Sequence, residues 1–219
     1  MPNKALLVID MIKDFVYKDV NPSLAVDNAY KMVMKLRELE ESAVKNNIPI
    51  IYCCDAHRKG DSELKIWGDH AMEGTKGSEI VDDLITDNMM TIKRNPKLDG
   101  LLDDDEKTPN LSHEEIVLGH KIFRVDKGTY NAFFNTALDN LLKTLGVDTV
   151  YITGTVTTVC DLNTAAGAAF RGYDVAVVKD CVADVTDEAN SFGLDYMRKN
   201  YNAGLKSLEE AKNDFEVKK

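Results

Sequence analysis

The chain has 219 residues, of which 44% are hydrophobic and 29% charged, and its 37 acidic and 27 basic residues give a formal net charge of −10. This length and composition predict a single domain over residues 1–219, with a core that needs no disulfide or structural metal. The acidic charge argues against a nucleic acid or an anionic membrane as the main partner. The N-terminal apolar run is short and ends at Asp10, so we expect neither a signal peptide nor a membrane span and infer a cytoplasmic protein.

Short apolar runs alternate with helical segments along the chain. The expected strands are the runs 5–9, 48–53, 122–125, 147–153 and 174–179, with a shorter strand-like run at 116–118. The expected helices are 24–45, with Ser23 as its N-cap, 132–145 and 158–171, and the chain after residue 179 is expected to be mainly helical. This alternation predicts a three-layer α/β/α fold with a mostly parallel, Rossmann-like central sheet. In such a sheet, ligands bind at the carboxyl ends of the strands.

Two segments between these elements have no clear periodicity. Residues 55–77 mix His, Asp, Glu, Trp and Gly, which is typical of an ordered functional loop rather than a linker. Residues 99–115 are acidic and polar, and we interpret them as a surface excursion or a subunit-contact loop.

A cysteine follows the strand expected at 147–153. Cys160 comes six residues after Gly154, where the chain turns and a helix is expected to begin. The positive end of the helix dipole and the free N–H groups there favour the thiolate, which is the reactive form, and could bind an oxyanion. The competing interpretation is a buried structural cysteine, and this segment alone does not decide between the two.

Two charged residues stand at the ends of other expected strands. Asp10 closes the first strand, where it could accept a proton or could instead cap a loop by bonding backbone N–H groups. Lys127 follows the strand at 122–125, although a lone lysine in a loop is more often solvated.

The loop after the second strand carries residue types that bind metals. Asp55 and His57 form a DxH pair, and Glu63 and His70 follow within the same loop. Two imidazoles and two carboxylates predict a divalent-metal site, for which zinc is our first choice and iron or manganese are alternatives. The competing interpretation is a set of loop hydrogen bonds and a surface histidine.

Together these segments resemble the isochorismatase-like cysteine hydrolases. LLVIDMIKDF resembles that family's opening strand with its aspartate, DKGTYNAFF its lysine motif, TGTVTTVCDLNTA its nucleophile motif and GYDVAVVKDCVAD the strand that follows. The motifs occur in the family's order and cover nearly the whole chain. Residues 99–115 are the part that we cannot place in this pattern.

The resemblance implies a role for each matching residue. Cys160 would be the nucleophile, and Asp10 would accept the thiol proton and later pass it to the leaving amine. Lys127 would hold the aspartate and help to stabilise the charges. A cis peptide would fall at Thr155–Val156, and the backbone N–H groups of Val156 and Cys160 would form the oxyanion hole.

The nicotinamidase branch of this family adds a metal beside the pocket, at positions that match Asp55, His57, Glu63 and His70. In that branch the metal holds the pyridine nitrogen of nicotinamide, and the ring lies between aromatic residues that match Phe15 and Trp67. By themselves these two residues could equally belong to the core. Tyr130 falls at a further aromatic position that faces the pocket. Family members are commonly dimers or tetramers, so the resemblance implies a homodimer or a homotetramer.

Our leading hypothesis is a nicotinamidase, which forms nicotinate and ammonia through a cysteine thioester. A sibling amidase that acts on a carbamoyl, ureido or other small amide would use the same triad and leave the DxH loop structural. Val159 departs from the nicotinamidase pattern and leaves the substrate contacts open. The resemblance implies that an isochorismatase proper, which cleaves a vinyl ether, needs no cysteine nucleophile, and a non-catalytic binding protein needs no triad. A redox role for Cys53 and Cys54 is weaker, because we expect free thiols that serve in packing.

Overall fold

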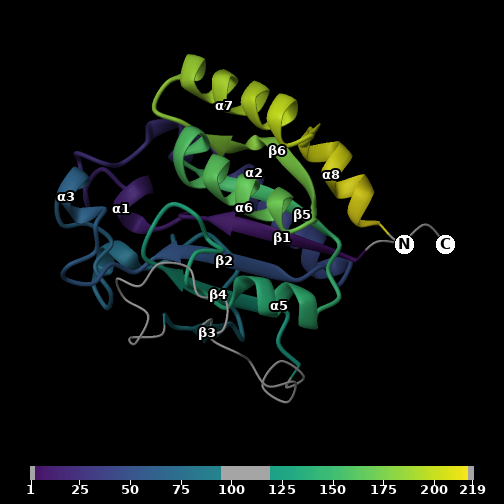
Figure 1. Ribbon diagram of the computed structural model, residues 1–219, viewed down its shortest axis with the longest axis horizontal. Coiled ribbons are helices and arrows are strands. Elements are labelled where there is room, and N and C mark those ends of the chain that lie inside the picture. The colour runs from purple at the N-terminus through teal and green to yellow at the C-terminus, as the bar shows by residue number, and fades with distance from the viewer. Residues whose placement is uncertain (1–2, 95–118, 217–219) are drawn as a thin grey trace.

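The structure is a computed structural model that describes residues 3–94 and 119–216, and within them seven parallel strands form one sheet (Figure 1). Along the sheet the strands follow the order β3-β4-β2-β1-β5-β6-β7. Their bounds are β1 (Lys4–Ile9), β2 (Ile50–Asp55), β3 (Met90–Ile92), β4 (Ile122–Lys127), β5 (Thr149–Thr155), β6 (Asp174–Ala183) and β7 (Gly204–Lys206). Every pairing between neighbouring strands is parallel.

Helices cover both faces of this sheet, which confirms the three-layer fold. The helices are α1 (Lys13–Val16), α2 (Asp27–Lys45), α3 (Leu64–Trp67), α5 (Leu138–Thr144), α6 (Leu162–Phe170), α7 (Asp187–Asn200) and α8 (Leu208–Phe215). Side chains of α2 and α8 pack with one set of alternating strand residues, and those of α5, α6 and α7 pack with the other set. Because both faces are covered, the central strands are apolar throughout, and this explains why they were recognisable as continuous runs.

The two adjacent cysteines of β2 serve these two separate cores. Successive side chains of a strand point to opposite faces, so Cys53 packs on the side of α5 to α7 and Cys54 on the side of α2 and α8. Cys53, Cys54, Cys160 and Cys181 are all buried free thiols. The geometry therefore favours packing over redox chemistry for Cys53 and Cys54.

Several predicted boundaries are wrong. Helix α2 begins at Asp27, and Val26 rather than Ser23 holds the N-cap position. Helix α5 begins at Leu138 rather than at residue 132, because residues 132–137 form turns in which the Thr136 hydroxyl bonds the carbonyl of Ala132. Strands β3 and β7 were not expected, since three residues each are too few to show a pattern. The run 116–118 and the acidic segment 99–115 lie outside the described residues.

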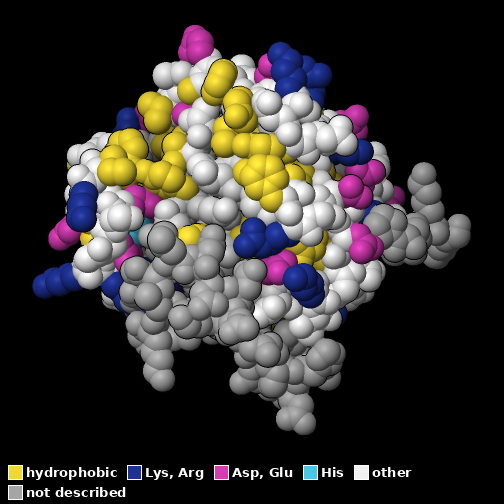
Figure 2. Space-filling model, viewed as in Figure 1, with side chains coloured by type: hydrophobic (Ala, Val, Ile, Leu, Met, Phe, Trp, Pro, Cys, Tyr) yellow, Lys and Arg dark blue, Asp and Glu magenta, His cyan; other side chains and the backbone are white. Residues whose placement is uncertain are grey.

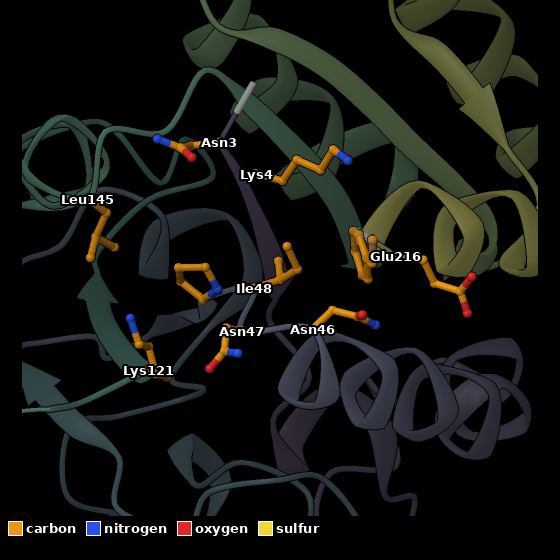
Figure 3. Close-up of a pocket in the computed structure, with 10 residues that line it drawn as sticks. Asn3, Lys4, Asn46, Asn47, Ile48, Lys121, Leu145 and Glu216 are labelled. Atoms are coloured by element: carbon orange, nitrogen blue, oxygen red, sulfur yellow. The ribbon is translucent and has the colours of Figure 1, made fainter. Parts of the chain in front are cut away.

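The surface offers two further features. Apolar side chains gather in Figure 2 over the region where Figure 1 places α6 and α7, and the exposed large apolar residues of these helices are Phe170, Phe192 and Tyr196. A depression of about 370 Å³ lies at the amino ends of the strands, beside Lys4, Ile48 and Lys121 (Figure 3). It contains none of the expected site residues. Within the described ranges, every helix is too short or too polar to cross a membrane.

A buried carboxyl fixes α2 against the sheet. The Tyr52 hydroxyl donates to Glu40 Oε1 over 2.7 Å, and the Ile85 N–H donates to Glu40 Oε2 over 3.0 Å. Burial raises the pKa of Glu40 to about 7, against the effect of these two hydrogen bonds. Because the folded pKa lies above the unfolded one, the neutral acid stabilises the fold below about pH 4.5, and this stabilisation is lost as the pH rises through 7.

We therefore expect Glu40→Gln to gain stability relative to the wild type as the pH rises. Between pH 5 and pH 8 the difference in the free energy of unfolding should shift by about 2–3 kcal/mol in favour of the variant, since each pKa unit corresponds to about 1.4 kcal/mol. Urea denaturation at the two pH values measures this shift. Glu41→Gln, an exposed neighbour, is the matched control, and an equal shift in both variants would contradict the assignment to Glu40.

Candidate active site

Four neighbouring strands deliver the expected triad and Asp55 to one edge of the sheet. Lys127 is the last residue of β4, and Asp55 is the last residue of β2. Asp10 directly follows β1, and Cys160 follows β5 through a short turn. Because the carboxyl ends of parallel strands meet at one edge, residues from four distant parts of the chain become neighbours.

A buried ammonium group connects these residues. Lys127 Nζ lies 2.7 Å from Asp10 Oδ2 and 2.6 Å from Asp55 Oδ1, and it also faces Cys160 Sγ at 3.8 Å. Lys127, Asp10 and Asp55 are fully buried, and Cys160 is 5% exposed. The interpretation of Lys127 as a solvated loop lysine is therefore wrong, and the structure brings the three predicted triad residues together.

Close contact between β5 and β1 determines where Asp10 lies. Gly154 has φ +124°, and a Cβ atom there would lie 2.0 Å from the carbonyl oxygen of Ile9, so only glycine fits. Asp10 itself has φ 49°, and its Oδ1 accepts the Asp55 N–H over 2.8 Å. The peptide bond Thr155–Val156 is cis, as the family resemblance implied.

The nucleophile lies in a turn rather than at the start of an ordinary α-helix. Residues Thr157–Asp161 form one π-helical turn, and α6 continues from Leu162, which corrects the helix expected at 158–171. Asp184 holds this turn, because its Oδ2 accepts the Thr158 N–H over 2.8 Å and the Thr158 hydroxyl over 2.7 Å.

Burial decides the ionisation of the nucleophile in this structure. It raises the pKa of the Cys160 thiol well above its usual value, although the charge of Lys127 acts in the opposite direction. This direction runs against the prediction that the position favours the thiolate. Asp161 behind it is fully buried, and burial together with the charges of Asp10 and Asp184 raises its pKa well above the usual range. We infer that the thiol loses its proton to a base only when it reacts.

The two carboxyl groups beside Lys127 differ in their proton affinity. Burial and the neighbouring charge of Asp55 raise the pKa of Asp10 to about 6. Burial also acts on Asp55, but there the charge of Lys127 and the neighbouring His57 outweigh it, and the pKa is lowered to about 2. Asp10 is thus the better proton acceptor, while Asp55 stays a permanent anion. This division agrees with Asp10 as the base of the triad.

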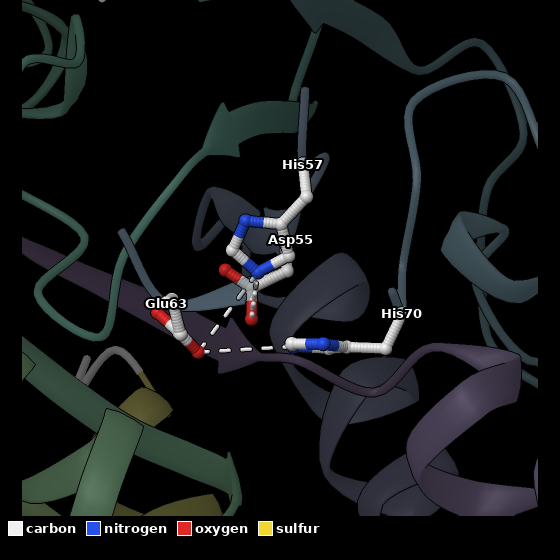
Figure 4. A group of neighbouring side chains, drawn as sticks. All are labelled: Asp55, His57, Glu63 and His70. Atoms are coloured by element: carbon white, nitrogen blue, oxygen red, sulfur yellow. Dashed lines mark ion pairs between the residues drawn. The ribbon is translucent and has the colours of Figure 1, made fainter. Parts of the chain in front are cut away.

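The four expected metal ligands converge beside the triad (Figure 4). His57 Nε2 lies 3.6 Å from Asp55 Oδ2 and 3.9 Å from Glu63 Oε1, and His70 Nε2 lies 3.8 Å from the same Glu63 oxygen. One oxygen or nitrogen of each residue falls within 4.8 Å of the corresponding atoms of the others. All four side chains are buried.

The donor atoms of this group fit a divalent metal. His57 Nδ1 bonds Asp61 and His70 Nδ1 bonds the Gly68 carbonyl, so both imidazoles present Nε2 to the centre. Among the described residues, Asp55 Oδ2, His57 Nε2 and Glu63 Oε2 have no hydrogen-bond partner although they are buried. Unpartnered buried polar atoms are costly unless a ligand satisfies them. Two neutral imidazoles and two carboxylates are a donor set typical of zinc, iron and manganese.

Each of the three expected aromatic residues belongs to the metal loop or contacts a residue of it. The Phe15 ring lies 5.6 Å from the His70 ring, centroid to centroid. Trp67 is 49% exposed, and its Nε1 donates to the Tyr130 hydroxyl over 2.8 Å. None of the three is a fully buried core residue, which supports their interpretation as walls of a site.

Sequence reasoning missed three residues that support the site. Asp61 contacts His57, Arg94 contacts Asp61, and Asp184 holds the nucleophile turn. Asp184 directly follows β6, so the rule that located Asp10 could have found it. Arg94 belongs to no motif, and only the fold brings it near.

Comparisons with known proteins agree with this arrangement. The model of the isochorismatase domain matches residues 4–106 and 105–210. An uncharacterised isochorismatase family protein, YaaI of Bacillus subtilis, is 31% identical over 195 residues, which cover 89% of this chain and 88% of that protein. The N-carbamoylsarcosine amidase of Thermoplasma acidophilum has a TM-score of 0.73 at 29% identity and covers 95% of this chain and 98% of its own. The pyrazinamidase/nicotinamidase of Streptococcus mutans has a TM-score of 0.73 at 28% identity, with coverages of 93% and 99%.

We expect Lys127→Met to destabilise the metal-free protein strongly. The substitution leaves Asp10 and Asp55 buried without the cation between them, and a broken buried ion pair costs about 3–5 kcal/mol. Urea denaturation after chelation measures the loss. Lys18→Met, which removes an exposed ion pair with Asp27, should cost less than about 1 kcal/mol. A loss for Lys127→Met that is no larger than this control would contradict the role of the buried cation.

Proposed function

The chain belongs to the isochorismatase family and is an amidohydrolase of that family, and we propose that it hydrolyses nicotinamide to nicotinate and ammonia with the help of a divalent metal. The observation that carries this proposal is the position of Asp55. One of its oxygens bonds Lys127 of the triad, and the other faces the unpartnered His57 Nε2 of the candidate metal site. A metal beside a cysteine nucleophile suits a substrate that offers both an amide and a ring nitrogen.

In the proposed mechanism Asp10 accepts the proton of the Cys160 thiol as the sulfur attacks the amide carbon. The backbone N–H groups of Val156 and Cys160 are proposed to bind the oxyanion that forms on the former carbonyl oxygen. When the C–N bond breaks, the proton passes from Asp10 to the leaving nitrogen, which departs as ammonia. The positive charge of Lys127 is proposed to stabilise the negative charges that develop during these steps.

The resulting thioester is opened by water. Asp10 is ionised again at this stage. It takes a proton from a water molecule while the oxygen of that water attacks the thioester carbon. The C–S bond then breaks, the sulfur regains a proton from Asp10, and the acid is released. The enzyme returns to its neutral thiol, the form that the buried position of Cys160 favours.

Asp55, His57, Glu63 and His70 would hold the metal, with zinc preferred and iron or manganese as alternatives. Bound there, it would supply a Lewis-acid contact for a pyridine nitrogen. The aromatic side chains of Phe15, Trp67 and Tyr130 are proposed to enclose the ring, and the contact of Phe15 with His70 and the bond between Trp67 and Tyr130 support this proposal.

A second candidate is an amidase for a carbamoyl or ureido compound. It is favoured by the N-carbamoylsarcosine amidase of Thermoplasma acidophilum, which resembles this chain as closely as the nicotinamidase does. The same triad would serve such a substrate, and the metal ligands would then be structural. The burial of Cys160 beside Asp10 and Lys127 argues against both a vinyl-ether isochorismatase and a non-catalytic binding protein.

Two further expectations accompany this proposal. Four buried free thiols suit the reducing environment of the cytoplasm, where we propose that the protein works. The homodimer or homotetramer implied by the family resemblance stays a prediction.

Replacement of the nucleophile should separate activity from folding. We expect Cys160→Ala to lower kcat to background while the free energy of unfolding changes by less than about 2 kcal/mol, because only a small buried group is lost. Cys181→Ala removes a buried thiol outside the site and should retain turnover. Ammonia release and urea denaturation give the two readouts. Turnover near the wild-type rate in Cys160→Ala would rule out the nucleophile.

Ammonia release from nicotinamide, with and without prior chelation, tests the substrate. We expect release that chelation abolishes and that zinc, iron or manganese restores. N-carbamoyl amino acids and ureido compounds form the comparison panel. Release from that panel alone, unaffected by chelation, would favour the second candidate and contradict the metal-dependent nicotinamidase.

A further inference from the structure

We propose that Asp61, held in place by Arg94, is a positioning residue that presents His57 to the metal and strengthens metal binding. The inference rests on the metal site of the proposed function. It concerns two residues that lie outside the expected ligand set.

Asp61 contacts the side of His57 that faces away from the candidate metal centre. Its Oδ2 lies 3.0 Å from His57 Nδ1, and the same oxygen accepts the Arg58 N–H over 3.0 Å. The Asp61 side chain is 9% exposed, and that of His57 is fully buried. A hydrogen bond at Nδ1 places the imidazole proton there and leaves Nε2 bare toward Asp55 and Glu63.

Arg94 occupies both oxygens of Asp61. Its Nη1 donates to Oδ2 over 2.7 Å and its Nη2 donates to Oδ1 over 3.0 Å, a bidentate pair. Asp61 is therefore not available as a ligand itself, in contrast to Glu63, whose Oε2 has no partner among the described residues. This difference separates a ligand from a residue that positions one.

The guanidinium of Arg94 ties three strand ends to the metal loop. Nη1 also donates to the Ala56 carbonyl over 3.1 Å, directly after β2. Arg94 itself follows β3, and its guanidinium packs on Gly128, directly after β4. A Cβ atom at Gly128 would lie 2.3 Å from the guanidinium carbon, so any side chain there would displace Arg94. Asp61 is thus fixed to the rigid sheet that also carries Lys127.

The two histidines of the site are supported differently. His70 Nδ1 bonds a backbone carbonyl, that of Gly68, over 2.8 Å. His57 bonds a carboxylate, and a carboxylate behind an imidazole raises its basicity as a ligand as well as fixing its orientation. We therefore expect most of the support for metal binding to act through His57.

Zinc affinity, measured by competition with a chromophoric chelator, tests this directly. Asp61→Ala should bind zinc about 10–100-fold more weakly than the wild type, the range seen when such outer partners are removed. Asp61→Asn, which can still accept the Nδ1 proton but carries no charge, should fall between the two. Glu73→Gln is the matched control, because the Glu73 side chain pairs with Arg58 and Lys93, while its bond to the His57 carbonyl comes from the backbone and is unaffected by the substitution. It should bind zinc as the wild type does.

Arg94→Met and Gly128→Ala disturb the pairing of Arg94 with Asp61 without altering Asp61 itself. Both should weaken zinc binding, and the double variant Asp61→Ala, Arg94→Met should lose no more affinity than Asp61→Ala alone, since Arg94 acts through Asp61. Additive losses would overturn the proposed route. These variants also keep the test decisive if Asp61→Ala fails to fold.

A spectroscopic readout separates positioning from general destabilisation. With Co²⁺ in place of zinc, the visible absorption bands report the ligand geometry, and we expect them to shift in Asp61→Ala and to stay unchanged in Glu73→Gln. Wild-type affinity and an unchanged Co²⁺ spectrum in Asp61→Ala would overturn this inference and leave the proposed function intact. A wild-type protein that binds no divalent metal would overturn both.

Discussion

The arrangement of the candidate site depends on one buried positive charge, the ammonium group of Lys127. Lys127 is fully buried between Asp10 and Asp55, and the charges of these carboxylates raise its pKa well above the usual value although burial opposes them. An isolated buried ion is costly, so the three groups are stable only together. They meet because β4, β2 and β1 are parallel neighbours that end at the same edge. The close contact of Gly154 with Ile9 places the end of β5 at the same edge. The turn that carries Cys160 follows directly from there.

Asp55 joins the proposed catalytic and metal-binding groups into one electrostatic unit. Its Oδ1 accepts the Lys127 ammonium group, while its Oδ2 faces His57. Because Lys127 keeps Asp55 ionised, a permanent anion is available on the metal side, and Asp10 is left as the group with the higher proton affinity. The proposed reaction therefore starts from a neutral thiol and a nearby base rather than from a preformed thiolate. This starting point follows from burial, which together with the charges of Asp10 and Asp55 outweighs the charge of Lys127 at Cys160.

The sequence predicted those parts of the structure that depend on local patterns. Strands covered on both faces are continuous apolar runs, and the residues at or directly after their ends, such as Lys127 and Asp10, could be placed from the run alone. The family motifs added the expected nucleophile role of Cys160 and the cis peptide before it. Burial and pairing across the fold could not be predicted in this way. The ionisation of Cys160 depends on how deeply it lies, and the contact of Asp61 with Arg94 joins residues that no motif connects.

The site is divided between two kinds of backbone, and this division has an evolutionary consequence. Asp10, Asp55 and Lys127 lie at or directly after strands of the sheet, and Cys160 follows β5 through a short turn, whereas the other proposed metal ligands and aromatic walls lie in the segments that connect the strands. Connecting segments tolerate substitution and insertion far better than a covered parallel sheet does. A lineage built on this plan can exchange the groups that recognise a substrate while its bond-breaking groups stay fixed. Relatives with one common chemistry and diverging substrates are the expected outcome.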